Sequence, residues 1–488
     1  MSKDVVSRFD HDFSLTLDTG TAVSDIDGRY RRITKPFANY FSEAGLQRYR
    51  TAVEVEYLLH LSDRGVVRTF KETEKKYLKD LVKGFSPADF KTIKKIEKET
   101  NHDVKAVEYF VKRKLPQSMS DVKEMVHFAL ASEDTSNLAL SLALKNSTQT
   151  VLVPAILEPF EKIVDFADRY KSTPMLARTH GQPASPTTLG KEFANFAYRI
   201  DEGIRRVADF RFPGKLNGAT GNFNAHVAAI PNVDWEKFSR SFVKDRLGLE
   251  YIPMTTQILP HDRISRFFRE IVSLNDIVEG VDADVWRYIS DDWFKLKVEE
   301  GETGSSTMPH KVNPIEFENS EGNLPTANAM FNFLASKLQK SRLQRDLTDS
   351  TVKRKYGAAM GWTLIGYSSL SKGMDKIEPN IDEIAAALVD SPEVISEPLQ
   401  QTLRTKGYDK AYEKVKGLTR GKKVTLKDIH KFISGLDIDE NTRKRLLALR
   451  PEIYTGYAER LTTKAVKDFR KTIGTLRLCR VTEYVSSA

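Results

Sequence analysis

Residues 264–285 read ISRFFREIVSLNDIVEGVDADV, and this stretch decides the fold class. Its apolar residues recur every three or four positions, which is the spacing of one face of an α-helix. They are Ile264, Phe267, Phe268, Ile271, Leu274, Val278, Val281 and Val285. A helix of about 20 residues spans about 30 Å. The stretch therefore predicts a long amphipathic helix that packs lengthwise against others of its kind.

The same periodicity recurs in residues 151–170 and 188–210. Regular alternation of apolar and polar residues, the mark of a half-buried strand, is scarce along the chain. No short internal repeat and no segment of low complexity interrupts the helical pattern. We therefore predict an all-α fold built around a long central helical bundle.

The chain has 488 residues, which is more than one ordinary hydrophobic core accommodates. The long helices fall in the middle, and shorter, lysine-rich amphipathic segments follow after about residue 375. We predict three helical domains with approximate limits. They are an N-terminal domain (1–121) with Arg29 and His102, a central bundle domain (122–374) with His180 and the 301–314 loop, and a C-terminal domain (375–488).

Composition and charge narrow the class of protein. With 40% hydrophobic and 29% charged residues, the chain is globular. No apolar run approaches the roughly 18–20 residues that cross a bilayer, and the N-terminus lacks the apolar segment of a signal peptide. We therefore expect no membrane partner and an intracellular, cytoplasmic protein, with an organelle left open. The single cysteine, Cys479, forms no internal disulfide, and the formal charge of +9 suits nucleic acid and small anionic substrates alike.

Three stretches between the helices are rich in polar and turn-forming residues, and we expect them to be loops. They are 100–104, 178–188 and 301–314. Active sites are commonly built from loops with reactive side chains that a rigid helical scaffold holds in place. These loops are therefore the first place to look for catalytic residues.

The 301–314 stretch has the composition of a loop that closes over a substrate. It contains two glycines and three consecutive hydroxyl side chains at 305–307. Asn313 precedes a proline, and this pair is a good start for a helix, so Asn313 could be only a helix cap. Lys311 indicates an anion-binding role for this loop as well, because a cation beside a helix N-terminus attracts an anionic group.

Two histidines, His102 and His180, lie in the predicted loops and not on an apolar helix face. A loop histidine is more often a structural hydrogen-bonding group than a catalyst, but its near-neutral pKa suits proton transfer. No pair of histidines has the helical spacing of a zinc site, and no glycine-rich nucleotide loop is present. We expect neither a metal nor a cofactor.

A cationic group is the third candidate for chemistry. Arg342, Arg345 and Arg354 surround Ser350 and Thr351, and Arg29 lies near the N-terminus. Arginines with neighbouring hydroxyl groups bind phosphate through paired, charge-assisted hydrogen bonds.

Together these stretches resemble the fumarase/aspartase superfamily. The sequence Gly-Ser-Ser-Thr-Met-Pro-His-Lys-Val-Asn-Pro at 304–314 resembles its signature loop. Within the superfamily, His310 and Arg-Thr-His-Gly-Gln-Pro-Ala at 178–184 resemble the bacterial-type branch of adenylosuccinate lyases. The stretches at 27–30, 100–110 and 344–351 are similar to the same branch. The resemblance covers about residues 20 to 460.

The resemblance implies a β-elimination that releases fumarate and needs no cofactor. The substrates would be adenylosuccinate, giving AMP, and the succinyl-aminoimidazole-carboxamide ribotide (SAICAR), giving AICAR. Matching positions imply that Ser305 is the general base and His180 the general acid. Lys311 and Asn313 would hold the succinyl carboxylates, with Lys311 stabilising the charge that develops. His102 would orient the substrate.

The resemblance also assigns contacts with the substrate. The 5′-phosphate would be bound by Arg29, Tyr30, Arg345, Ser350 and Arg354. Gln257 would contact the succinyl group. Further substrate contacts would come from Asn101, Asp103, Ser132, Thr179, Ser306 and Met308. Spacing alone does not separate Ser305 from Ser306 as the base.

The family resemblance implies a homotetramer whose active sites are each built from three subunits. Two alternatives stay open at this point. One is another fumarate-releasing enzyme such as argininosuccinate lyase. The candidate phosphate-binding arginines argue against this alternative. The other is a basic helical nucleic-acid-binding protein, which the charge of +9 permits but which leaves the loop histidines unexplained.

Overall fold

The computed structural model describes residues 18–297, 308, 311–419 and 424–486, with side chains described as far as Leu478, Thr419 excepted. The chain divides into two compact units, each assembled from separate stretches of sequence. Unit 1 comprises residues 1–155, 206–275 and 322–366, and unit 2 comprises 156–205, 276–321 and 367–488. The division into three domains predicted from the sequence stays a prediction.

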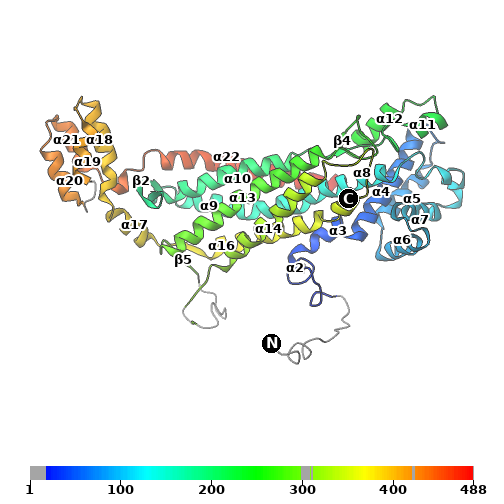
Figure 1. Ribbon diagram of the computed structural model, residues 1–488, viewed down its shortest axis with the longest axis horizontal. Helices are drawn as coiled ribbons and strands as arrows, with labels where there is room; N and C mark the ends of the chain where they lie inside the picture. The colour runs from blue at the N-terminus through cyan, green and yellow to red at the C-terminus, as the bar shows by residue number, and fades with distance from the viewer. Residues whose placement is uncertain (1–17, 298–307, 309–310, 420–423, 487–488) are drawn as a thin grey trace. The chain divides into compact units, whose positions relative to one another are not determined.

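Helices dominate the described residues, which confirms the predicted all-α class (Figure 1). Five long helices contain residues of both units. They are α9 (Val153–Arg169), α10 (Leu189–Ala208), α13 (Asp262–Ser290), α14 (Ile315–Lys337) and α16 (Tyr356–Lys376). The three stretches with helical periodicity fall on α9, α10 and α13, as predicted. Among the described residues, no helix is long and apolar enough to cross a membrane.

Unit 1 otherwise consists of further helices, of which α4 (Glu43–Asp63) is the longest, and two very short strands. Its helices are α2 (Arg31–Thr34), η1 (Lys35–Phe37), α3 (Ala38–Phe41), α4 (Glu43–Asp63), α5 (Glu72–Lys83), α6 (Pro87–Thr100), α7 (Asp103–Lys114), η2 (Gln117–Met125), α8 (Ser132–Ser147), η3 (Thr148–Leu152), α11 (Asn224–Ala229), α12 (Trp235–Ser241), η4 (Phe242–Arg246) and α15 (Thr348–Lys353). Strands β3 (Pro213–Gly214) and β4 (Glu250–Tyr251) pair in parallel.

Aromatic side chains join the long helices inside unit 1. The ring of Phe268 on α13 lies 5.2 Å from that of Phe331 on α14 and 5.1 Å from that of Tyr356 on α16, centroid to centroid. All three side chains are buried. Such ring pairs stabilise a core beyond the area that they bury. They also fix the start of α16, which immediately follows α15.

A buried ion pair fixes the N-terminus of α8. The Asp134 carboxylate lies 2.9 Å from the Lys215 ammonium, and both side chains are fully buried. The same carboxylate accepts hydrogen bonds from the backbone N–H groups of Ala131, Asn217 and Gly218 at 2.8–3.1 Å. Buried charges persist only when they are paired and hydrogen-bonded in this way. The first turn of α8, with Ser132 and Glu133, is therefore rigidly placed.

Unit 2 adds two antiparallel strand pairs, a group of short helices and one long helix, α22 (Ala458–Ser486). Strand β1 (Pro174–Thr179) pairs with β2 (Gln182–Thr188), and β5 (Phe294–Leu296) pairs with β6 (Ile377–Pro379). The helices are α17 (Ile381–Val389), η5 (Pro392–Ile395), α18 (Ser396–Thr405), α19 (Ala411–Thr419), α20 (Leu426–Ser434), α21 (Glu440–Ala448), η6 (Pro451–Ile453) and α22 (Ala458–Ser486).

The core of unit 2 brings α9, α10 and β5 together. The ring centroids of Phe166 and Phe193 are 4.2 Å apart, and Phe294 lies within 6 Å of both. Gly190 at the start of α10 lets the backbones approach closely, because a Cβ there would lie 2.5 Å from backbone atoms of Lys171. This close approach packs the start of α10 against the end of α9.

Candidate functional site

His180 lies at the tip of a β-hairpin in unit 2, and not in the irregular loop predicted for residues 178–188. Thr179 pairs with Gln182 across the hairpin, so His180 and Gly181 form a two-residue turn. Their φ angles of 54° and 72° are both positive, as a type I′ hairpin turn requires. The loop prediction was wrong because a His-Gly pair can adopt this turn and let residues 182–188 pair as a strand.

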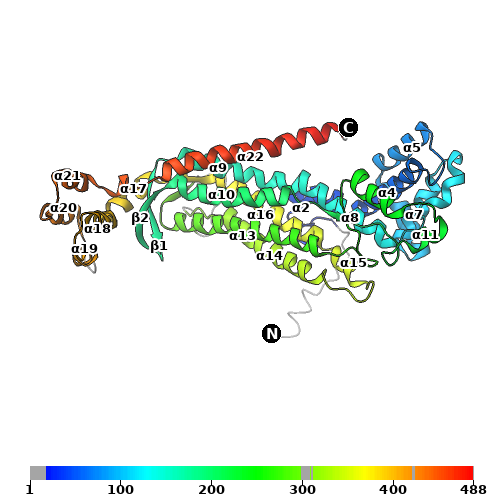
Figure 2. The same cartoon turned by 90° about the horizontal axis from the view of Figure 1, so that it is seen from above.

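Side chains from the C-terminal part of unit 2 anchor this hairpin, which lies beside α17 (Figure 2). The hydroxyl of Ser185 on β2 donates a hydrogen bond to the Glu397 carboxylate, which also accepts one from the Tyr454 hydroxyl at 3.1 Å. The Arg178 guanidinium lies over the Trp293 ring at 5.4 Å from its centroid. The side chains of Thr179 and His180 are exposed. The anchored hairpin thus exposes the His180 imidazole to solvent.

The predicted 301–314 loop is described only in part. Met308, Lys311 and the following residues are described, whereas Ser305, Ser306 and His310 lie outside the described residues. The side chains of Met308 and Lys311 are exposed. Helix α14 begins at Ile315, and the carbonyl of Pro314 accepts hydrogen bonds from two backbone N–H groups of its first turn. The helix therefore starts one residue later than predicted, and Asn313 lies just outside it.

His102 lies at the joint between α6 and α7 in unit 1. Asn101 ends α6 with a φ of 51°, and His102 caps α7 by accepting a hydrogen bond at Nδ1 from the Lys105 backbone N–H at 3.2 Å. His102 is therefore a structural hydrogen-bonding group, as the sequence analysis allowed. This role does not exclude a substrate contact, because the cap uses one ring nitrogen and half of the side chain is exposed.

Arg345 is the centre of a group of predicted substrate-binding residues in unit 1. Its Nη1 donates hydrogen bonds to Ser132 Oγ at 3.1 Å and to Gln257 Oε1 at 3.2 Å. Its Nη2 donates to Ser350 Oγ at 3.1 Å. Gln257 is itself held by the Ala219 carbonyl, to which its Nε2 donates at 3.0 Å. Four residues from α8, α15 and two loops, predicted from separate parts of the sequence, thus meet at one guanidinium.

Two buried carboxylates and a buried ammonium lie behind Arg345. Glu133 Oε2 is 3.7 Å and Asp349 Oδ1 is 3.9 Å from guanidinium nitrogens of Arg345. The other oxygen of each carboxylate contacts Lys353 Nζ, at 2.5 Å for Glu133 and 2.8 Å for Asp349. The sequence prediction missed Lys353 and did not count Glu133 as a site residue, because isolated charges carry no sign of burial. The i,i+4 spacing of Asp349 and Lys353 was the one available signal.

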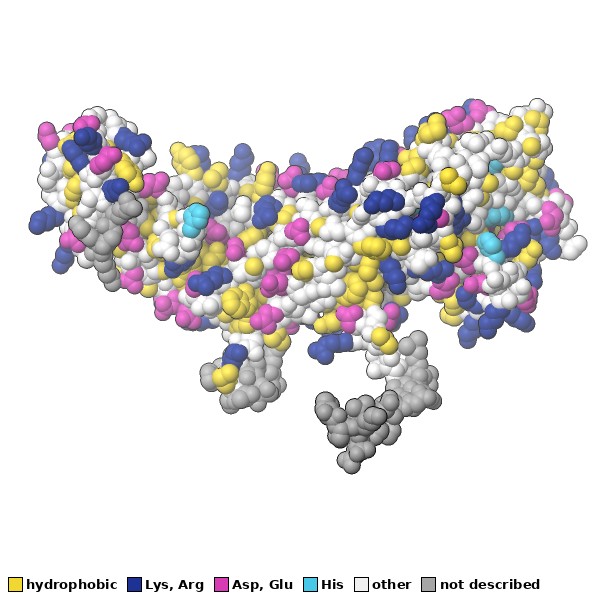
Figure 3. Space-filling model, in the orientation of Figure 1, with side chains coloured by type: hydrophobic (Ala, Val, Ile, Leu, Met, Phe, Trp, Pro, Cys, Tyr) yellow, Lys and Arg dark blue, Asp and Glu magenta, His cyan; other side chains and the backbone are white. Residues whose placement is uncertain are grey.

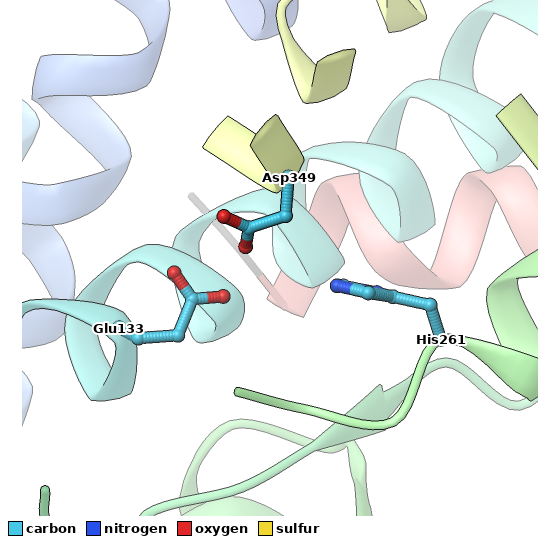
Figure 4. A group of neighbouring side chains, drawn as sticks. All are labelled: Glu133, His261 and Asp349. Atoms are coloured by element: carbon cyan, nitrogen blue, oxygen red, sulfur yellow. The ribbon is translucent and has the colours of Figure 1, made fainter. Parts of the chain in front are cut away.

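His261 completes this buried group (Figure 4). Glu133, Asp349 and His261 place ligand atoms within 4.8 Å of one another, the arrangement of a possible metal site among the described residues. Lys353 Nζ already lies between the two carboxylates, however, where an ion would have to sit. Burial, with a smaller effect of Lys353, lowers the pKa of His261 well below its ordinary value, so the imidazole is neutral. The lysine ammonium is therefore the cation of this group.

A cavity of about 260 Å³ opens beside these residues within unit 1. Ser350, Arg354 and Asp103, which the sequence predicted to bind substrate, lie in its wall. Arg50 and Ser136, which it did not predict, line it as well. This volume lies just below the roughly 300–1,000 Å³ typical of small-ligand sites. Its hydroxyl and guanidinium groups suit an anionic group.

The arginines of this wall are held by carboxylates. Arg50 Nη1 lies 2.7 Å from Asp103 Oδ2, and its Nη2 donates to Ser136 Oγ at 3.1 Å. Arg354 pairs with Glu43 and, at 3.6 Å, with Asp103. An incoming anion would share these guanidinium groups with the carboxylates. Asp103 accordingly holds two arginines in place, which gives this predicted site residue a physical role.

Arg29 and Tyr30 lie at the start of α2 and do not line this cavity. The Arg29 guanidinium lies 5.9 Å from the centroid of the Tyr30 ring. Trp362 on α16 anchors the segment by donating from Nε1 to the Asp25 carboxylate at 3.1 Å. Their predicted role in binding phosphate therefore stays a prediction.

An ion pair between His127, which precedes α8, and Glu54 on α4 was not predicted from the sequence. His127 Nδ1 and Glu54 Oε1 are 2.6 Å apart, and the Thr135 hydroxyl donates to the same oxygen at 2.8 Å. Burial works to lower the pKa of His127, but the Glu54 carboxylate outweighs it, and the pKa is raised above its ordinary value. The imidazolium therefore stabilises the fold at pH values where it is charged.

This pair predicts a pH-dependent effect of His127→Asn on stability. The stabilisation is complete below the unfolded pKa of about 6.5 and is lost as the pH rises through the higher folded pKa. We expect His127→Asn to lower the free energy of unfolding more at pH 6 than at pH 9, measured by urea unfolding. Asparagine tolerates the φ of 63° at this position. An equal loss at both pH values would show that the ion pair contributes nothing.

Comparison with known proteins places the chain in a family. A family model described as "Lyase" matches residues 28–328, and one described as "Adenylosuccinate lyase C-terminal" matches residues 341–455. The chain is 47% identical over 455 residues to an adenylosuccinate lyase of Vibrio cholerae, covering 92% of this chain and 100% of that one. The chain belongs to the adenylosuccinate lyase family. This confirms the predicted family and function and makes the chain a lyase.

Two further adenylosuccinate lyases have the same 47% identity to this chain. The relative from Haemophilus influenzae is 47% identical, covering 92% of this chain and 100% of the relative. The relative from Escherichia coli strain K12 is 47% identical, covering 91% of this chain and 98% of the relative. The family assignment also argues against the nucleic-acid-binding alternative.

Solved structures of more distant proteins share the fold. A 3-carboxy-cis,cis-muconate lactonizing enzyme from Pseudomonas putida superposes with a TM-score of 0.70 at 16% identity, covering 90% of this chain and 97% of that one. A fumarate lyase from Mesorhizobium sp. BNC1 gives a TM-score of 0.69 at 13% identity, covering 89% and 97%. At such low identity these two structures speak for the fold alone.

Proposed function

We propose that the chain eliminates fumarate from adenylosuccinate, giving AMP, and from SAICAR, giving AICAR. The observation that carries this proposal is the convergence of Ser132, Gln257 and Ser350 on the Arg345 guanidinium beside the cavity. Both substrates carry a 5′-phosphate, and a guanidinium surrounded by hydroxyl groups suits that group. Argininosuccinate carries no phosphate, so the cluster favours the purine substrates over that alternative.

The chemistry is an elimination with two proton transfers, one from the carbon next to the C–N bond that breaks and one to the nitrogen of that bond. A base removes the proton from Cβ of the succinyl group, the C–N bond breaks, and the double bond of fumarate forms. The departing nitrogen receives a proton from an acid. We assign these roles to Ser305 and His180, with Lys311 and Asn313 at the succinyl carboxylates. A cation such as Lys311 stabilises the negative charge that develops on the carboxylate after the proton leaves.

The position of His180 supports its assignment as the acid. An imidazole donates and accepts protons near neutral pH. The hairpin turn holds it at a defined place, and its exposed side chain is accessible to a ligand. His102 and Asn101 lie next to Asp103 of the cavity wall, which supports their assignment to substrate binding.

We further propose that the active enzyme is a homotetramer in which several chains contribute to each site. Large apolar side chains are exposed on the long helices, as expected of a surface that another chain covers. They include Trp286 on α13 and Ile315 and Phe333 on α14. The cytoplasmic location expected from the sequence stays a prediction.

The distribution of charge supports a small anionic substrate over nucleic acid. On the face shown in Figure 3, Lys and Arg side chains are interspersed with Asp and Glu side chains and do not form one basic stripe. A nucleic-acid-binding surface concentrates its cations along the path of the backbone.

The proposal is tested by the ultraviolet absorbance change when the purified protein is mixed with adenylosuccinate. We expect conversion to AMP and fumarate in equal amounts, with both products identified by chromatography. Argininosuccinate serves as the matched control and should not be consumed. Consumption of argininosuccinate, or no conversion of adenylosuccinate by folded protein, would overturn the assignment.

A further inference from the structure

The buried group behind Arg345 is a ring of alternating charges. Each of the carboxylates of Glu133 and Asp349 uses one oxygen for Lys353 and the other for Arg345. Two cations and two anions therefore alternate around the ring, and their formal charges cancel. All four residues belong to unit 1, so the arrangement rests on contacts inside one compact body.

Burial differs between the members of this ring. The side chains of Glu133, Asp349 and Lys353 are 1%, 5% and 4% exposed, whereas that of Arg345 is 21% exposed. Arg345 is thus the member most exposed to solvent, while Glu133 and Lys353 lie in the wall of the cavity. The distances follow the same order, because the carboxylates lie 2.5–2.8 Å from Lys353 but 3.7–3.9 Å from Arg345. The carboxylates are bound mainly by the lysine and only loosely by the arginine.

We propose that Lys353 is a positioning residue that keeps the charge of the Arg345 guanidinium available to the phosphate of the substrate. Without the lysine, two buried carboxylates would share Arg345 as their nearest cation. Attraction in a water-poor environment would draw the guanidinium onto them and away from a ligand. With the lysine present, the carboxylates orient Arg345 without consuming its charge. This inference rests on the proposed function, in which Arg345 binds the 5′-phosphate.

The neighbouring His261 supports this role for the lysine. Its side chain is 4% exposed, and both ring nitrogens lack a hydrogen-bond partner among the described residues. Because burial and the adjacent Lys353 keep it neutral, it adds no charge to the ring. The positive charge that balances the carboxylates from behind is therefore that of Lys353. A purely apolar contact at position 353 would not replace it.

The test compares Lys353→Met with the double variant Lys353→Met/Glu133→Gln. The single change leaves two carboxylates against one guanidinium, whereas the double change restores equal numbers of charges. We expect Lys353→Met to weaken AMP binding about tenfold or more, measured by titration calorimetry, with KM raised more than kcat is lowered. The double variant should bind AMP within about threefold of the wild type. Lys353→Arg should also restore binding, because it keeps the cation.

Two controls separate positioning from other effects. Lys355→Met makes the same substitution at an exposed position two residues away and should leave AMP binding unchanged. Inhibition by fumarate, which carries no phosphate, should be the same in Lys353→Met as in the wild type. Thermal unfolding establishes that each variant is folded. If the single variant does not fold, the double variant alone decides, since it leaves no uncompensated charge.

Each outcome has a defined meaning. Unchanged AMP binding in Lys353→Met would overturn the inference. A folded double variant that binds AMP as weakly as the single one would also overturn it, because Lys353 would then contact the ligand itself. Failure of the wild type to convert adenylosuccinate would instead refute the proposed function. That failure is seen in the turnover assay before any variant is made.

Discussion

His180→Asn is expected to lower kcat for adenylosuccinate by about 10²–10⁴-fold while leaving the fold intact. The substitution removes the proposed general acid, so the departing nitrogen must take its proton from water. Asparagine is the suitable replacement because it accepts the left-handed backbone of the hairpin turn, where His180 has a φ of 54°. The measurement is steady-state turnover, followed by the absorbance change of the purine.

The control for this variant is a histidine of unit 2 to which no role is assigned. His430 on α20 contacts Arg450 at 3.3 Å, and His430→Asn should retain the wild-type rate. Full activity in His180→Asn would contradict the assignment of the acid.

Arg345→Met is expected to raise KM for adenylosuccinate by about 10²-fold, the effect of losing a charge-assisted contact to phosphate. The guanidinium presents a planar fork to Ser132, Gln257 and Ser350. A lysine at this position cannot reproduce that fork, so Arg345→Lys should recover only part of the loss. Initial-rate kinetics over a wide range of substrate concentration would separate KM from kcat.

Arg342→Met is the matched control, because this arginine is 80% exposed in its side chain and lies three residues away. It should leave KM unchanged. If Arg345→Met lowered kcat without raising KM, the guanidinium would act on the chemistry and not on substrate binding. The phosphate site would then have to lie elsewhere.

The helices could be predicted because helix formation depends on residues that are close together in the sequence. The apolar face of 264–285 recurs along the chain, and a helix forms wherever that period holds long enough. The structure extends this stretch to α13, Asp262–Ser290. The start of α14 was also predicted to within one residue, since Asn313 and Pro314 are turn and cap residues whose preferences act over a few positions.

The hairpin at His180 was missed because its signal lies in backbone angles. His-Gly is a rarer form of the two-residue turn than Asn-Gly, and the flanking residues lack clear alternation. The pairing of Ala177 with Ala184 and of Arg178 with Pro183 appears only in three dimensions. A pattern of polar residues between helices therefore indicated a loop where two strands form.

The proposed substrate-binding residues were predicted as separate positions, but their arrangement was not. Resemblance to a family pointed to Ser132, Gln257, Arg345 and Ser350, and the structure brings them together. Lys353 and the burial of Glu133 could not be predicted, because a charged residue is normally exposed. Only contacts between α8 and α15 show that the two side chains neutralise each other.

The most direct measurement compares release of fumarate from adenylosuccinate with release from its dephosphorylated form, succinyladenosine, by the wild-type protein. The account predicts rapid conversion of adenylosuccinate and a kcat/KM at least about 10³-fold lower for succinyladenosine, because binding of the remote phosphate contributes to reaching the transition state. Equal kcat/KM for the two compounds, or conversion of neither, would contradict it.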